Sequence, residues 1–67
     1  MNTPEQRAAY INAQVACAMI EAMGMQAENM HRENASGYVP YGEEAFDALI
    51  AKYGIDHNSV IGYLREV

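Results

Sequence analysis

The sequence is poor in the residues that stabilise a small fold covalently or through a metal. Its 67 residues include one cysteine, Cys17, so no disulfide can form within the chain. At this length a single core contributes only about 3–5 kcal/mol unless a disulfide, a metal or a second subunit adds to it. No cluster of metal-ligating side chains stands out in the sequence. We therefore expect oligomerisation to stabilise the fold, in a reducing, intracellular compartment.

Basic residues are also scarce. Four Lys and Arg stand against nine Asp and Glu, which leaves a net charge of −5. This balance disfavours binding to nucleic-acid phosphates and to anionic membrane surfaces. The longest apolar run, residues 15–20, is far short of the ~20 residues needed to cross a bilayer, and no basic segment of the signal-peptide kind begins the chain. We expect a soluble, cytoplasmic protein that has no membrane contact and whose partners are basic proteins.

The first half of the sequence predicts one long helix over about residues 4–32. Thr3 is a suitable N-cap, Pro4 suits the first helical position, and Gln6 completes a Thr-x-x-Gln capping box. The segment that follows has no proline and is rich in Ala, Met, Gln and Glu, which favour helix. Gly24 is the weak position, at about 1 kcal/mol relative to Ala. The sequence leaves open whether the helix breaks there.

Apolar residues cover more than half of the circumference of this helix, which predicts cover on two sides. At 100° per residue they form two neighbouring stripes. The first stripe is Ala8, Ile11, Val15, Ala18, Met19 and Ala22. We assign the second stripe to an interface between two copies of the chain. The second stripe is Ala9, Ala13, Ala16, Ile20, Met23 and Ala27. The remaining sector is polar, with Arg7, Gln14, Glu21 and Glu28.

The length of the predicted helix also favours a homodimer. Residues 4–32 would form a rod of roughly 43 Å. A compact monomer of this size has a radius of gyration of about 11 Å. Such a helix would extend past a monomeric core, and a second copy could cover the part that extends.

Residues 34–42 predict a linker, in which Pro40 holds Val39 in an extended conformation. We expect Tyr38, Val39 and Tyr41 to pack back over the long helix.

Two shorter helices are predicted at about residues 43–53 and 57–66. Gly54 suits the left-handed position after the first, and Asp56 suits the N-cap of the second. The apolar positions at helical spacing in the first are Phe46, Leu49, Ile50 and Tyr53. The predicted inner face of the second is Val60, Ile61 and Leu64. The predicted fold is therefore all-α: one long N-terminal helix and a C-terminal helical hairpin folded back on it, in a helical-bundle homodimer.

Residues 49–65 resemble the helix-turn-helix of DNA-binding proteins, with Gly54 at the turn. Two departures weaken this interpretation. Ile50 stands where the family usually has a small residue, and Arg65 is the one basic residue on the predicted exposed face. We favour a corner that only packs two helices together, and keep a dimeric DNA-binding regulator as the alternative.

No set of side chains predicts catalysis, a metal site or a cofactor, so we expect a non-enzymatic protein. Glu28 and His31 have the spacing of ligands in di-iron bundles, but no inward-facing glutamate on another helix accompanies them. Asp56, His57 and Ser59 are near neighbours in sequence, whereas the members of a catalytic triad must converge in space.

Two segments, TPEQRAAYINAQVACAMIEAMGMQAEN and YGIDHNSVI, resemble the small accessory proteins encoded in the early regions of lambdoid temperate bacteriophages. The resemblance is one of general sequence character along the whole chain. It includes no catalytic motif and assigns a function to no individual residue. It implies a small acidic protein in the host cytoplasm that modulates host or phage proteins by binding them.

The predicted function is therefore that of a protein-interaction module. A basic patch on the partner would complement the acidic start of the second helix. The residues predicted to contact the partner are Glu43, Glu44, Asp47, His57, Asn58 and Arg65.

Overall fold

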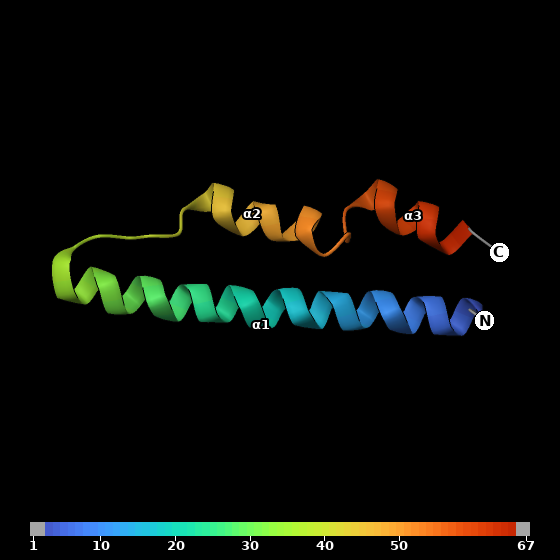
Figure 1. Cartoon of the computed structure of the whole chain (residues 1–67), viewed down its shortest axis with the longest axis horizontal. Helices are drawn as coiled ribbons and strands as arrows, with labels where there is room; N and C mark the ends of the chain where they lie inside the picture. The colour runs from blue at the N-terminus through green and yellow to red at the C-terminus, as the bar shows by residue number, and fades with distance from the viewer. Residues whose placement is uncertain (1–2, 66–67) are drawn as a thin grey trace.

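The computed structural model describes residues 3–65, and this part of the chain is all-α. It contains α1 (Pro4–Ser36), α2 (Glu43–Lys52) and α3 (His57–Arg65). α1 runs the length of the molecule, and α2 and α3 follow one another along its side in the opposite direction (Figure 1). The prediction of an all-α fold with one long N-terminal helix is confirmed.

α1 begins with the predicted capping box. The Thr3 hydroxyl accepts a hydrogen bond from the Gln6 N–H at 3.1 Å, and the Gln6 side chain accepts one from the Thr3 N–H at 2.9 Å. The helix does not break at Gly24. It continues through Ser36, past the predicted end near residue 32, because polar residues oppose a helix only weakly. It stops at Gly37, which adopts a left-handed conformation with φ 78°.

α2 ends as the sequence predicts, at a left-handed glycine. Gly54 has φ 65°, and its N–H donates to the Ala51 carbonyl at 3.1 Å. The Ile55 N–H donates to the Ile50 carbonyl at 3.0 Å. These two bonds form a Schellman motif, which satisfies carbonyls at the end of α2.

Asp56 caps α3, as predicted. Its carboxylate accepts a hydrogen bond from the Ser59 N–H at 3.1 Å. Hydrogen bonding to the side chain of Ser59, and then to its backbone N–H, lowers the pKa of Asp56. α3 is described to Arg65, so the predicted last residue, Glu66, lies outside the described residues.

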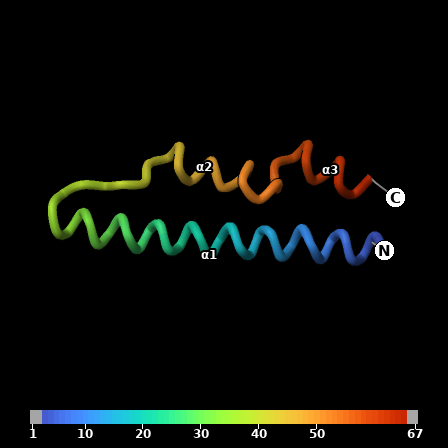
Figure 2. Tube along the Cα trace, viewed as in Figure 1, coloured from blue at the N-terminus to red at the C-terminus, as the bar shows by residue number. Residues whose placement is uncertain are grey.

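α2 and α3 do not form the predicted hairpin. Within residues 3–65 each of them packs against α1, and they do not pack against one another. Between α2 and α3 the chain continues along α1 instead of turning back (Figure 2). The C-terminal half therefore lies beside α1 along most of its length, and the overhang expected from a compact monomer does not arise.

The result is a thin, two-layered rod with little core. Its extents are 51 × 17 × 12 Å and its radius of gyration is 15.4 Å. Of the described residues, Ala18, Met25 and Leu49 are the ones that are buried. The accessible surface is 5144 Å². A compact monomer of 7.4 kDa would expose about 4,200 Å², so roughly 900 Å² is exposed in excess.

Candidate interaction site

Glu21 is the centre of a polar edge along the interface between α1 and α2. Its carboxylate accepts hydrogen bonds from the Lys52 ammonium at 2.8 and 3.0 Å and from the Tyr53 hydroxyl at 2.6 Å. The bonds from Lys52 and then Tyr53 lower the pKa of Glu21. The same bonds raise the pKa of Lys52 and of Tyr53. The side chains along this edge therefore hydrogen-bond to one another across the interface.

The polar edge continues toward α3 through Arg7. Its guanidinium donates to the Tyr63 carbonyl at 2.6 Å, and its central carbon lies 5.1 Å from the centre of the Tyr63 ring. The Tyr10 and Tyr63 rings have centroids 5.3 Å apart. Tyr63 is half-buried here, whereas Leu64, which was predicted to face inward, is 46% exposed. The predicted packing of α3 is therefore wrong at Leu64.

The sector of α1 that was interpreted as purely polar faces the C-terminal half of the chain. Arg7, Gln14 and Glu21 all hydrogen-bond to α3 or to the end of α2; for Gln14 the acceptor is the Tyr53 carbonyl at 3.3 Å. A thin interface accepts such residues because long side chains bury their stems while their ends reach hydrogen-bond partners. Polarity alone did not predict this orientation.

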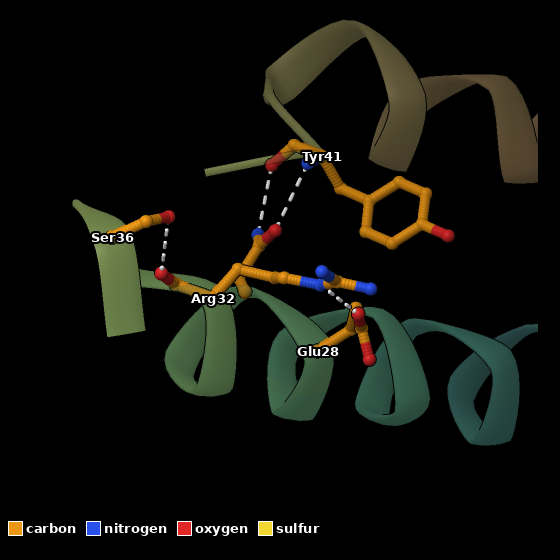
Figure 3. A network of polar contacts seen from close by, with 5 residues as sticks. Glu28, Arg32, Ser36 and Tyr41 are labelled. Carbon is orange, nitrogen blue, oxygen red and sulfur yellow. Dashed lines mark hydrogen bonds and ion pairs between the residues drawn. The ribbon is translucent and has the colours of Figure 1, made fainter. Parts of the chain in front are cut away.

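Asn29 attaches the linker to α1. Its side-chain amide donates to the Tyr41 carbonyl at 2.8 Å and accepts from the Tyr41 N–H at 2.9 Å (Figure 3). The predicted packing of the linker through its side chains is wrong for Tyr38 and Val39, which are 62% and 45% exposed. The pattern of apolar residues in the sequence does not indicate an attachment through backbone hydrogen bonds.

Glu28 pairs with Arg32 within α1. The Arg32 Nε lies 2.6 Å from the Glu28 carboxylate, and the Ser36 hydroxyl donates to the Arg32 carbonyl at 3.1 Å (Figure 3). The bond from Arg32 lowers the pKa of Glu28. His31 is exposed. No group of three or more His, Cys, Asp or Glu within residues 3–65 is placed to hold a metal ion.

The opposite edge of the α1–α2 interface is open and apolar. Met19 and Glu21 are two residues apart, about 200° around the helix, so they face opposite edges. A groove of about 220 Å³ lies on the Met19 side. Its lining is Val15, Ala18, Met19, Ala22, Phe46, Leu49, Ile50 and Ile55. Met19 and Ile50 are 60% and 45% exposed. The first stripe thus packs in part against α2 and in part lines this apolar groove.

The second stripe faces away from α2 and α3. Every one of its residues is exposed, Ile20 and Met23 at 68% and 65%. They alternate four and three residues apart, the spacing of a coiled-coil seam, and Met30 continues the series. α1 therefore presents an uncharged apolar seam that no part of residues 3–65 covers.

The residues predicted to contact a partner are all exposed, but they do not form one patch. Glu43, Glu44 and Asp47 lie in the first turns of α2, and within residues 3–65 none of them has an ion pair. His57, Asn58 and Arg65 lie on α3, beyond the far end of α2. We call the first three the acidic cluster.

Residues 49–65 do not adopt the crossed arrangement of a helix-turn-helix. In that motif the two helices meet at about 90–120° and pack on each other. Here α2 and α3 lie in a row on α1 (Figure 1). The sequence likeness therefore lies in the turn and the caps.

The fold defines an all-α protein in which a long helix carries a second helical segment, residues 43–65, along one side. No protein-family model, curated protein or solved structure matches the chain. Among residues 3–65 there is no helix that is long and apolar enough to cross a membrane.

Proposed function

We propose that the chain is a non-enzymatic protein-interaction module that works as a homodimer and binds a basic partner protein. The observation that carries this proposal is the uncovered second stripe on α1. The resemblance to early-region phage proteins favours a regulatory protein of the host or the phage as the partner.

The exposed area supports a dimer. The chain exposes roughly 900 Å² more than a compact monomer of its mass. A stable interface of standard size buries about 800 Å² on each partner. The C-terminal half of the chain covers one side of α1 only. If the second stripes of two chains paired, each chain would cover the exposed apolar side of the other.

The distribution of side-chain sizes along the seam supports an antiparallel arrangement. The N-terminal part of the seam consists of alanines, Ile20 lies at its centre, and Met23 and Met30 lie in the C-terminal part. An antiparallel pair sets small residues against large ones and keeps the two helices evenly spaced. A parallel pair would set methionine against methionine at one end and alanine against alanine at the other. The two helices would then lie farther apart at one end than at the other, which is unfavourable in an interface packed to native density.

The charges support a basic partner. Arg7, Arg32 and Lys52 are engaged with Tyr63, Glu28 and Glu21 respectively. The acidic cluster has no such partner within residues 3–65, so its charge is available to another molecule. Complementary charge mainly increases the association rate and the specificity of such contacts.

The test is the oligomeric state of the Ile20→Asp variant, measured by sedimentation equilibrium at micromolar concentration. We expect the unmodified chain to be a dimer and the variant a monomer, because the new carboxylate would be buried at the centre of the seam. Leu64→Asp is the matched control, an exposed apolar residue away from the seam, and should remain dimeric. A monomeric unmodified chain would reject the homodimer.

DNA binding by residues 49–65 stays a prediction of the sequence. It requires a salt-sensitive mobility shift of duplex DNA, since phosphate contacts dominate such affinity. No shift at low salt would eliminate it.

A further inference from the structure

We propose that the apolar groove between α1 and α2 binds a basic amphipathic helix of the partner protein. This inference rests on the proposed function, and it names the element of the partner that docks and the place where it docks.

The groove is lined by apolar side chains, so it can accept apolar side chains of another molecule. Phe46, Leu49 and Ile50 form the α2 wall, and residues of the first stripe form the α1 wall. Its volume of about 220 Å³ suits a few side chains rather than a whole small molecule, because pockets for drug-sized ligands measure about 300–1,000 Å³. A helix supplies such side chains in a row, at positions i, i+3, i+4 and i+7. The flexible Met19 at the rim can adjust to their shapes.

The charges beside the groove are acidic. Glu43 precedes Phe46 by three residues, and Asp47 precedes Ile50 by three, so each carboxylate lies one turn from a groove residue on the same side of α2. Both carboxylates are exposed and lack an ion pair within residues 3–65. Lys52 is held at the opposite edge by Glu21. A helix seated in the groove would therefore meet negative charge along its flank and favour Lys or Arg there.

A second copy of this chain fits the groove less well than a basic helix does. The second stripe, where we place the dimer contact, is uncharged, whereas Glu43 and Asp47 lie beside the α2 wall of the groove. A copy with a net charge of −5 would bring like charge toward that wall. Juxtaposed like charges suppress association.

The probe is a fluorescent helical peptide of about four turns, with leucines on one face and lysines on the other. Two further peptides are compared: one with Glu in place of Lys, and one with the same Leu and Lys distributed around the helix. Binding to the full chain is measured by anisotropy at low and moderate salt. We expect the amphipathic lysine peptide to bind, the other two to bind at least about tenfold more weakly, and salt to reduce its affinity.

Variants locate the binding site. Ile50→Asp and the double variant Glu43→Lys, Asp47→Lys should each weaken the lysine peptide about tenfold or more. The matched controls are Leu64→Asp, which is as exposed as Ile50, and Glu5→Lys with Glu33→Lys; they should bind like the unmodified chain. Met19→Asp is a second groove variant at a more exposed position, and circular dichroism checks the helix content of every variant.

Three results would overturn the inference: no binding to the unmodified chain, equal binding by the peptides, or equal binding by the groove variants and their controls. Dissociation of the dimer by Ile50→Asp would overturn it too, because a second copy would then occupy the groove. Loss of dimerisation in Ile20→Asp with retained peptide binding supports the two separate surfaces. Full binding of the lysine peptide by Ile50→Asp, with binding lost in the double variant Glu43→Lys, Asp47→Lys, would reject the groove but leave the proposed function intact.

Discussion

The side-chain amide of Asn29 holds the backbone of Tyr41 through two hydrogen bonds, at 2.8 and 2.9 Å. An amide that donates and accepts in this way replaces the pair of bonds that another backbone segment would make. The linker is thereby attached to α1 just before α2 begins at Glu43. This attachment sets where α2 lies along α1, and so which residues of the two helices meet.

Replacement of Asn29 by alanine should destabilise the fold by about 1–2 kcal/mol, because of two opposing effects. Two hydrogen bonds of about 0.5–1.5 kcal/mol each are lost, and the higher helix propensity of alanine offsets part of that loss. Urea unfolding followed by circular dichroism measures the change. Asn34→Ala is the matched control, an exposed asparagine of α1 whose side chain forms no hydrogen bond within residues 3–65. Equal effects of the two substitutions would show that the Tyr41 contact contributes nothing.

The Glu21 carboxylate should make stability pH-dependent at both ends of the range. Its pKa is lowered by Lys52 and then Tyr53, so its contribution is present above the ordinary carboxyl pKa and lost as pH falls through the lowered value. The pKa of Tyr53 is raised by Glu21, so that contribution is lost as pH rises through the raised value. Glu21→Gln should flatten both limbs of the pH–stability curve, whereas Glu33→Gln, at an exposed position on the same helix, should leave their shape unchanged.

Two glycines should respond in opposite directions to alanine. Gly54 has φ 65°, where a Cβ costs about 1–2 kcal/mol, so Gly54→Ala should destabilise the chain. Gly62 lies within α3, where alanine is favoured by up to about 1 kcal/mol, so Gly62→Ala should stabilise it. An added Cβ meets nothing within 4 Å at either position, so the contrast isolates the backbone. Thermal unfolding of both variants tests it, and a shared direction of change would contradict it.

Tyr63, rather than Leu64, should contribute the packing of α3. Tyr63 contacts Arg7 and Tyr10, whereas Leu64 is 46% exposed. Tyr63→Ala should therefore cost about 1–2 kcal/mol more than Leu64→Ala, in proportion to the apolar area that each loses. Chemical denaturation of the two variants in parallel decides it. A larger loss for Leu64→Ala would mean that α3 is rotated relative to this structure.

The sequence predicts the start of α1, the end of α2 and the start of α3 well because their caps are local. Thr3, Gly54 and Asp56 each bond to backbone or side-chain groups of neighbouring residues, so their roles can be deduced without the rest of the chain. The residues of the second stripe were also predictable as one apolar face, because helical periodicity alone determines which residues share a side of α1. The acidic cluster could be placed at the start of α2 for the same reason.

Tertiary structure decided which side of α1 faces the C-terminal half, and whether that half turns back on itself. Arg7 finds its acceptor in Tyr63, and Glu21 finds its donors in Lys52 and Tyr53, residues far away in sequence. The apolar groove exists because α2 lies beside the first stripe, where the bonds of Asn29 to Tyr41 and of Glu21 to Lys52 and Tyr53 hold it. Such pairings depend on the path of the whole chain, whereas periodicity describes one helix at a time. The sequence by itself therefore determined the helices, their caps and their apolar faces, and the tertiary structure alone decided which faces meet.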